Sequence, residues 1–132
     1  MFLNTEPGSH ILLESVDSTN RWLLDHSLPS GTVCSARVQT AGRGQRGRAW
    51  LAPQGGALLM SALLSYSIEQ IPGDLQLMPV LAGVALRDVV QARLSGPDRL
   101  ALKWPNDLVL QRHQSNGKLA GVLIESITDS QK

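Results

Sequence analysis

The sequence predicts an α/β fold, in which short strands are interleaved with helices. Several short runs are rich in apolar and β-branched residues and are bounded by turn residues, a pattern typical of strands. One longer segment, residues 77–94, carries apolar residues at helical spacing instead. At 132 residues, with 42% hydrophobic and 17% charged residues, the chain is long enough for one domain with a single core.

The first half of the chain predicts three strands and one short helix. The strands are expected over residues 10–16, 32–38 and 57–64. The last of these runs is almost wholly apolar, which indicates a strand covered on both faces. Ser18 is a suitable N-cap for a helix that continues to Leu24. Cys34, the single cysteine, lies in a predicted buried strand, so we expect a core residue, no disulfide and a reducing compartment.

The second half predicts one long helix followed by three strands. Residues 72–74 read Pro-Gly-Asp and break the chain before the helix at 77–94, with Pro79 expected in its first turn. Strands are expected over residues 100–104, 108–110 and 118–125. The polar stretch 111–117, which contains the turn-favouring pair Asn116 and Gly117, predicts a hairpin connection between the last two.

A glycine- and arginine-rich segment lies between the predicted strands of the first half. Residues 39–50 read Gln-Thr-Ala-Gly-Arg-Gly-Gln-Arg-Gly-Arg-Ala-Trp. The glycines, whose backbone can approach a ligand closely, are Gly42, Gly44 and Gly47. The arginines, whose guanidinium groups suit phosphate or carboxylate, are Arg43, Arg46 and Arg48. Because no acidic residue lies between Asp25 and Glu69, the arginines lack a local partner, and we expect the loop to bind an anion.

The spacing of these glycines also matches the dinucleotide-binding fingerprint Gly-x-Gly-x-x-Gly. That fingerprint requires a strand before it and a helix that begins within it. A strand is expected before the loop, but Pro53 and the pair Gly55 and Gly56 follow it and indicate further loop. The dinucleotide interpretation is therefore rejected. The remaining alternative to an anion site is a solvated surface loop whose arginines have no specific ligand.

A second polar stretch follows a predicted strand. Residues 103–107, Lys-Trp-Pro-Asn-Asp, place a lysine, an amide and a carboxylate at the strand end, and Lys118 begins a later strand. The two lysines are thus expected near the ends of neighbouring strands. The alternative interpretation of Asn106 and Asp107 is a turn after Pro105, as capping alone is the alternative interpretation of Ser18.

Charge and composition exclude several classes of protein. The formal net charge of +1 argues against a dedicated nucleic-acid binder, and 4% aromatic residues argue against a small RNA-binding protein. The first seven residues lack the basic and apolar regions of a secretory signal. No apolar stretch is long enough to span a bilayer, so we expect a cytoplasmic protein without a membrane partner.

Four motifs together resemble the catalytic domain of biotin protein ligases, within the biotin/lipoate ligase superfamily. In chain order they are Asp17-Ser18-Thr19-Asn20, the segment Gln39 to Trp50, Lys103-Trp104-Pro105-Asn106-Asp107, and Lys118-Leu119-Ala120-Gly121. The four motifs occur in the order and at the spacing of that family, and together they span nearly the whole chain. The resemblance implies a class II synthetase-like domain, an α/β (α+β) fold whose mixed β-sheet is backed by helices, with the ligand over one sheet face beneath the loop.

The resemblance also implies a reaction in two steps. The carboxylate of biotin attacks the α-phosphate of ATP to give biotinyl-5′-AMP, and a lysine of a biotin carboxyl carrier protein then takes the acyl group. The catalytic residues implied are Lys118 and Arg43. The biotin-binding residues implied are Ser18, Thr19, Asn20, Gln39, Gly42, Arg43, Gly44, Gln45 and Lys118. The ATP-binding residues implied are Arg46, Arg48, Trp50, Lys103, Asn106 and Asp107, with Asp107 also a ligand of Mg²⁺.

The chain departs from the family pattern in two respects. Gln45 stands where many members have a second arginine that helps to hold biotin and the adenylate. Members also continue further, so we expect residues 1–132 to be a partial catalytic domain, truncated at its C-terminus, with neither an N-terminal winged helix nor a C-terminal β-barrel. We therefore expect no operator DNA binding, and a homodimer is possible.

Two alternatives to a biotin ligase stay open. A lipoate or octanoate ligase or transferase belongs to the same superfamily, but an aliphatic acyl tail offers Ser18, Thr19 and Gln39 nothing to hydrogen-bond. The second alternative is a non-catalytic module that captures biotin or a carrier protein without turnover. Formation of an acyl-adenylate separates the enzyme from the module.

Overall fold

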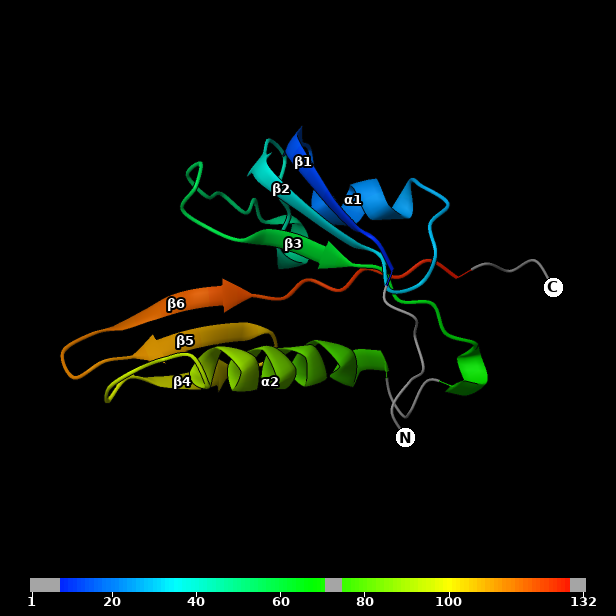
Figure 1. The fold of residues 1–132 in the computed structure, drawn as a ribbon. Helices are drawn as coiled ribbons and strands as arrows, with labels where there is room; N and C mark the ends of the chain where they lie inside the picture. The colour runs from blue at the N-terminus through cyan, green and yellow to red at the C-terminus, as the bar shows by residue number, and fades with distance from the viewer. Residues whose placement is uncertain (1–7, 71–74, 129–132) are drawn as a thin grey trace. The chain divides into compact units, whose positions relative to one another are not determined.

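The computed structural model describes residues 8–70 and 75–128, which divide into two compact units (Figure 1). The first unit holds residues 8–70 together with 125–128, and the second holds residues 75–124. Each unit is described by itself. The predicted break at residues 72–74 and the chain ends, residues 1–7 and 129–132, lie outside the described residues.

The first unit is a three-stranded mixed sheet in the order β1-β2-β3, with one short helix. Its elements are β1 (His10–Val16), α1 (Thr19–Leu24), β2 (Val33–Gln39) and β3 (Leu59–Ala62). β1 and β2 are parallel, which requires a crossover, and α1 lies within that connection. β3 then returns antiparallel to β2.

Helix α1 packs against β2 and β3 and covers one face of the sheet. The core between them holds Leu23, Cys34 and Leu59, each less than a tenth exposed. Cys34 is fully buried and unpaired, as predicted, and burial raises the pKa of its thiol.

The prediction for residues 57–64 is wrong in two respects. The strand covers only Leu59–Ala62, and burial alternates along it rather than extending to both faces. Leu59 is 7% exposed, whereas Met60 is 52% exposed. Met60 is in register with Ser35, and Ser35 with Leu12, which is also exposed. Because α1 covers the other face, this apolar run has one side that packs and one that does not.

The second unit is a three-stranded antiparallel sheet in the order β4-β5-β6, with the longer helix packed on it. Its elements are the 3₁₀ turn Leu75–Leu77, α2 (Met78–Gln91), β4 (Arg99–Lys103), β5 (Asp107–Gln111) and β6 (Asn116–Gly121). A further 3₁₀ turn, Ile68–Gln70, belongs to the first unit. Pro79 lies in the first turn of α2, as predicted.

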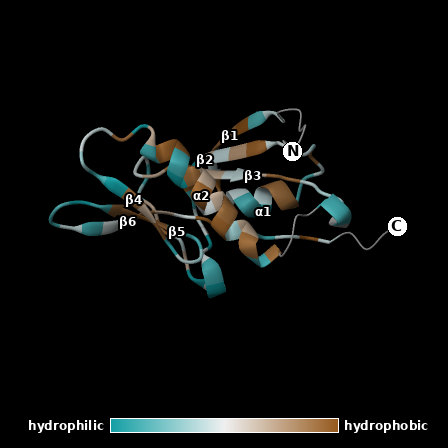
Figure 2. Cartoon of the chain, turned by 90° about the horizontal axis from the view of Figure 1, so that it is seen from below, coloured by the Kyte–Doolittle hydropathy of each residue, from teal (hydrophilic) through white to brown (hydrophobic). Residues whose placement is uncertain are grey.

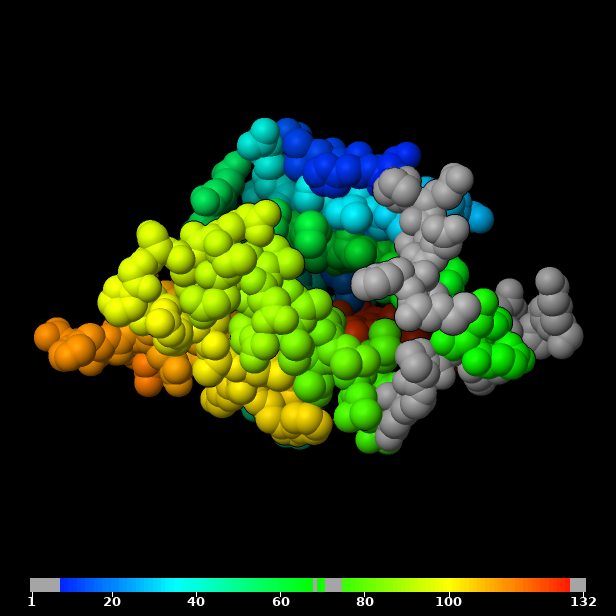
Figure 3. Space-filling view, turned by 60° about the horizontal axis from the view of Figure 1, so that its bottom comes forward, coloured from blue at the N-terminus to red at the C-terminus, as the bar shows by residue number. Residues whose placement is uncertain are grey.

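Helix α2 approaches its sheet closely at one point. A Cβ on the buried Gly83 would lie 2.6 Å from Leu102 Cδ1, so the helix contacts β4 where its own side chain is smallest. At the end of α2, Gln91 Oε1 accepts a hydrogen bond from the backbone N–H of Leu100 at 2.8 Å. The outer surface of α2, yellow-green in Figure 3, carries Leu81 and Val89, each 54% exposed.

The predicted hairpin connection within residues 111–117 is confirmed but is shorter than expected, and the predicted end of the last strand is wrong. Asn116 and Gly117 are the first residues of β6, paired with Gln111 and Leu110, and the connection is the polar stretch 112–115 (teal in Figure 2). A hydrogen bond from the Arg112 N–H to the Ser115 carbonyl at 3.0 Å closes that connection, so strand pairing continues through the Asn-Gly pair. In addition, β6 ends at Gly121 rather than at residue 125.

The predicted fold class is confirmed, with two small sheets where one mixed sheet was expected. Only the first sheet is mixed, because the connections in the second are short hairpins that impose antiparallel pairing. Helix α2, with 14 residues, is the longest in the part of the chain that the structure describes. Neither it nor any other described helix has the length and hydropathy of a membrane span.

Candidate functional site

The candidate site of the first unit begins at the N-terminus of α1. Ser18 is 5% exposed, and its hydroxyl accepts a hydrogen bond from the backbone N–H of Arg21 at 3.4 Å. The backbone N–H of Ser18 donates to Asp17 Oδ1 at 2.6 Å. The predicted N-cap is therefore confirmed, and capping accounts for Ser18. A ligand contact of Ser18 stays a prediction.

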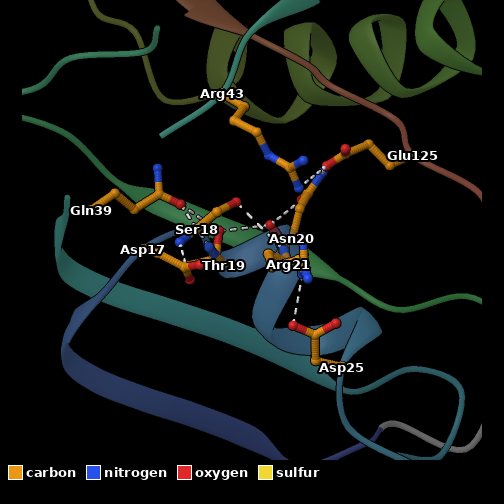
Figure 4. A network of polar contacts seen from close by, with 10 residues as sticks. Asp17, Ser18, Thr19, Asn20, Arg21, Asp25, Gln39, Arg43 and Glu125 are labelled. Carbon is orange, nitrogen blue, oxygen red and sulfur yellow. Dashed lines mark hydrogen bonds and ion pairs between the residues drawn. The ribbon is translucent and has the colours of Figure 1, made fainter. Parts of the chain in front are cut away.

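Thr19 connects α1 to the end of β2 (Figure 4). Its backbone N–H and its hydroxyl both donate to Gln39 Oε1, at 2.8 and 2.9 Å. Its hydroxyl also lies 2.7 Å from the Ser61 hydroxyl on β3. Thr19 is 3% exposed, so this triangle of polar groups is sheltered from water.

Asn20 extends this network to a residue distant in the sequence. Its Oδ1 accepts a short hydrogen bond from the Ser61 hydroxyl, and its Nδ2 donates to Glu125 Oε2 at 3.0 Å. The same carboxylate oxygen accepts from Arg43 Nη2 at 3.1 Å. We call Thr19, Asn20, Gln39, Arg43, Ser61 and Glu125 the α1 polar cluster; all six lie within the first unit.

The α1 polar cluster supplies an anion to one of the loop arginines. Arg43 is paired with Glu125, which lies 82 residues further along the chain. The absence of local acidic residues predicted the need for an anion but could not show that a distant carboxylate supplies one. In the described ranges, 8–70 and 75–128, neither Arg46 nor Arg48 forms a salt bridge.

The glycine and arginine loop folds back on itself as a small hairpin. Arg43 forms a β-bridge with Ala49, the Gly44 N–H donates to the Arg48 carbonyl at 2.7 Å, and the Trp50 N–H donates to the Gly42 carbonyl at 2.8 Å. The 3₁₀ turn Gln45–Gly47 forms its tip. No α-helix begins in the loop or in the described residues that follow it up to Ile68, which agrees with the rejection of the dinucleotide fingerprint.

The glycines of the loop are needed for different reasons. A Cβ on Gly42 would lie 2.6 Å from the Trp50 carbonyl oxygen and 2.9 Å from Gln39 Nε2, so only glycine permits this approach. The approach is to the protein itself, where a ligand was expected. Gly47 has φ +73, which favours glycine, whereas a Cβ on Gly44 would meet nothing closer than 3.5 Å.

Sequence reasoning missed Ser61 and Glu125. Ser61 is the one hydroxyl within the apolar run 57–64, and that exception was the available signal. Glu125 comes directly after an apolar run, but no feature of the neighbouring sequence indicates its contact with Arg43. Both connections depend on the tertiary fold.

The predicted site residues of the second unit lie on its β-hairpins. Lys118 Nζ and Asp107 Oδ1 form a salt bridge of 2.7 Å, with the Asp107 side chain 22% exposed. Lys103 is opposite Asp107 at the end of the first hairpin. Lys103 on β4 and Lys118 on β6 flank β5, so the expectation of neighbouring strands is wrong.

The turn predicted after Pro105 is confirmed for Asn106, whose contact with a nucleotide stays a prediction. Asn106 lies in the turn between β4 and β5, and its backbone carbonyl and side-chain Nδ2 bond the N–H and carbonyl of Val122, each at 2.8 Å. Asp107 is instead the first residue of β5. Across the described residues, no three His, Cys, Asp or Glu side chains converge as metal ligands, so Asp107 is a single carboxylate.

The predicted site residues thus form two groups. The first unit holds the loop and every predicted biotin-binding residue except Lys118: Ser18, Thr19, Asn20, Gln39, Gly42, Arg43, Gly44, Gln45, Arg46, Arg48 and Trp50. The second unit holds Lys103, Asn106, Asp107 and Lys118. The roles of both groups toward biotin and ATP stay predictions.

Relatives of the chain are ligases. The bifunctional ligase/repressor BirA of Escherichia coli is 42% identical over 120 residues, which cover 89% of this chain and 35% of that protein. The biotin–[acetyl-CoA-carboxylase] ligase of Paracoccus denitrificans is 37% identical over 129 residues, covering 87% of this chain and 46% of that protein. The chain therefore spans between a third and a half of the length of these relatives.

A solved structure and a family model agree with these relatives. The biotin protein ligase from Aquifex aeolicus, in complex with biotin and ATP, matches with a TM-score of 0.74 and 34% identity, over 89% of this chain and 46% of that one. The model of the biotin/lipoate A/B protein ligase family matches residues 12–132. The chain therefore belongs to the biotin/lipoate A/B protein ligase family.

Proposed function

We propose that the chain activates biotin with ATP to give biotinyl-5′-AMP and transfers the biotinyl group to a lysine of a biotin carboxyl carrier protein. The observation that carries this proposal is the α1 polar cluster. It gathers hydroxyl and amide groups in a sheltered place beside one cation, Arg43. A neutral ureido ring needs both donors and acceptors, and the carboxylate of the same substrate needs a cation.

The relatives support biotin over other acids. The Aquifex aeolicus protein is described in complex with biotin and ATP, and the Paracoccus denitrificans protein is named a ligase for acetyl-CoA carboxylase. We therefore assign biotin and ATP to this chain as substrates, and a biotinylated carboxylase as its partner. Thr19 and Gln39 would bond the ureido head together with Asn20.

Lys118 is the residue that we propose acts on the reacting groups. The first step brings a carboxylate to an α-phosphate, so like charges meet and negative charge spreads over the phosphoryl oxygens. An ammonium group at that point lowers the barrier. The salt bridge with Asp107 holds the Lys118 ammonium in a defined place before substrates arrive.

The loop and the first hairpin of the second unit would bind ATP. Arg46 and Arg48, which form no salt bridge among the described residues, suit its phosphates, and the half-buried Trp50 offers an aromatic face to adenine. Asp107 would be the residue that holds the Mg²⁺ of the ATP complex, which would supply positive charge to the phosphates, and a single carboxylate suits that mode of binding. Lys103 and Asn106 would orient the nucleotide. We place the reaction in the cytoplasm, where a thiol such as Cys34 stays reduced.

A lipoate or octanoate ligase or transferase is the alternative within the family. The α1 polar cluster argues against it, because an aliphatic chain carries no donor or acceptor that its hydroxyl and amide groups could bond. Capture of biotin without turnover is the alternative of another class.

One experiment tests the proposal and both alternatives. The purified chain is incubated with Mg-ATP and an equimolar mixture of biotin, lipoate and octanoate, and each acyl-AMP is measured by mass spectrometry. Biotinyl-AMP is expected to dominate. Lipoyl-AMP or octanoyl-AMP as the main product would contradict the substrate, and the absence of any adenylate would contradict catalysis by this chain. Arg112→Ala, an exposed cation paired with Asp98, is the control variant and should change nothing.

A further inference from the structure

We propose that Glu125 is a positioning residue that fixes the pattern of hydrogen-bond donors and acceptors in the α1 polar cluster. One oxygen of its carboxylate, Oε2, accepts from both Arg43 and Asn20. The inference rests on the proposed function in one respect, that the cluster binds the ureido head of biotin. Its structural part concerns the ligand-free chain and stands by itself.

The side-chain amide of Asn20 has a donor end, Nδ2, and an acceptor end, Oδ1. An ionised carboxylate only accepts hydrogen bonds, so the Nδ2 end of Asn20 must face Glu125. The reversed amide would place Oδ1 against the carboxylate oxygen, and two acceptors would repel each other. Glu125 therefore forces Oδ1 of Asn20 to face Ser61.

The orientation of the Asn20 amide in turn fixes the directions in which the hydroxyl protons of Ser61 and Thr19 point. Ser61 has one hydroxyl proton and must give it to Asn20 Oδ1. Toward Thr19, 2.7 Å away, Ser61 can then only accept, so the Thr19 hydroxyl is the donor of that pair. The Thr19 hydroxyl thus shares its proton between Ser61 and Gln39 Oε1, and the direction of the whole chain of hydroxyls is set from Glu125.

Gln39 lies at the end of this chain of hydrogen bonds that is farthest from Glu125. Its Oε1 accepts from both the backbone and the hydroxyl of Thr19, so its Nε2 points the other way, toward Gly42. Thr19 is 3% exposed, so reversing any one group would leave a buried polar atom without a partner. The donors and acceptors that a ligand meets are thereby ordered before it binds, which lowers the entropic cost of binding.

The variants Glu125→Gln and Glu125→Ala separate hydrogen-bond acceptance from charge. The glutamine oxygen can take the place of Oε2 and accept from both donors, whereas alanine accepts nothing. The Kd of biotin should stay within about twofold in Glu125→Gln and rise about tenfold in Glu125→Ala, the usual effect of losing a bond to a buried polar group. Equal losses in the two variants would overturn the proposal, since charge would then be the cause.

A double-mutant cycle distinguishes positioning from general damage to the fold. If Glu125 acts through Asn20, Glu125→Ala should add little to the loss of biotin affinity in Asn20→Ala. Fully additive losses would contradict the proposal.

Nuclear magnetic resonance of the ligand-free chain tests the structural part without biotin. The side-chain NH₂ signals of Asn20, assigned with Asn20→Ser, should keep their positions in Glu125→Gln and shift in Glu125→Ala. Unchanged signals in Glu125→Ala would overturn the proposal even if biotin binds. If the parent chain does not bind biotin, the proposed function fails in that respect, and these signals alone decide whether Glu125 orders the cluster.

Discussion

The two units hold their polar residues in different ways. In the first unit, the side chains of the α1 polar cluster come from α1, the end of β2, the loop, β3 and residue 125, and contacts such as Asn20 with Glu125 join residues 105 positions apart. In the second unit, Lys118 meets Asp107 across one hairpin, at the surface. The first arrangement depends on the whole tertiary fold of its unit, whereas the second depends on strand register alone.

This difference assigns different roles to the two groups. A network of mutually bonded, sheltered groups is rigid and selective, which suits recognition of a substrate. A half-exposed ion pair on a hairpin can exchange one partner for a charged substrate, which suits chemistry. Substitutions in the first unit should therefore change affinity, and those in the second should change turnover.

The largest effect is expected from Lys118→Ala. Removing an ammonium group that faces the transferred charge should lower the rate of biotinyl-AMP formation by about 100-fold to 1,000-fold. The Kd of biotin should change much less than the rate, because Lys118 is not part of the α1 polar cluster. Single-turnover formation of adenylate and a biotin titration measure the two quantities. An equal change in both would remove the distinction between the units.

The next effect is expected from Gly42→Ala, with Gly44→Ala as its matched control. The new Cβ at residue 42 would meet the Trp50 carbonyl at 2.6 Å, so the loop must move away from Gln39. We expect the Kd of biotin to rise at least about tenfold and unfolding to become easier by about 1–3 kcal/mol. Gly44→Ala should change the free energy of unfolding little, because its Cβ would meet nothing closer than 3.5 Å. Calorimetric titration and urea unfolding of both variants check this, and similar losses of stability in the two would be inconsistent with the described loop.

A smaller effect is expected from Gln45→Arg. The glutamine can donate a hydrogen bond at the loop tip but cannot neutralise charge, so an added guanidinium should slow release of the anionic adenylate by roughly threefold to tenfold. Release is measured by chasing labelled biotinyl-AMP from the chain with unlabelled adenylate. An unchanged release rate would show that residue 45 does not contact the adenylate.

The smallest effect is expected from Glu14→Ala on the outer face of the first sheet. Glu14 pairs with Arg37 at 3.1 Å, but both side chains are more than half exposed. Such pairs contribute about 0–1 kcal/mol, so the free energy of unfolding should change by less than about 0.5 kcal/mol. The Kd of biotin should stay the same, because this face is opposite α1. A loss of affinity here would mean that affinity in the first unit is not specific to the cluster.

Local patterns predicted the elements well and their pairing less well. β1 matches its predicted bounds, and Ser18 and Pro79 mark the helix starts as expected, because capping and helix initiation involve only adjacent residues. The hairpin within residues 111–117 was predicted but its bounds were not, because strand pairing continues through Gln111, Asn116 and Gly117 and leaves 112–115 as the connection. The division into two sheets was not encoded in any local pattern.

The candidate site was predicted in its members more than in its connections. Thr19, Asn20, Gln39 and Arg43 were identified from motifs and meet in one network. Ser61 and Glu125 were missed, since their partners lie 42 and 82 residues away in sequence. The ion pair of Lys118 and Asp107 was also not foreseen, because register across a hairpin decides it.

The central claim is that the α1 polar cluster recognises the ureido head of biotin. Its most direct test is calorimetric titration of biotin and of octanoate into the parent chain and into Thr19→Val, which keeps the shape of the side chain and removes its hydroxyl. Biotin should bind the parent and bind Thr19→Val about tenfold more weakly, while the weaker binding of octanoate should be the same in both. Equal biotin affinity in the two proteins, or octanoate binding as tight as biotin binding, would contradict the claim.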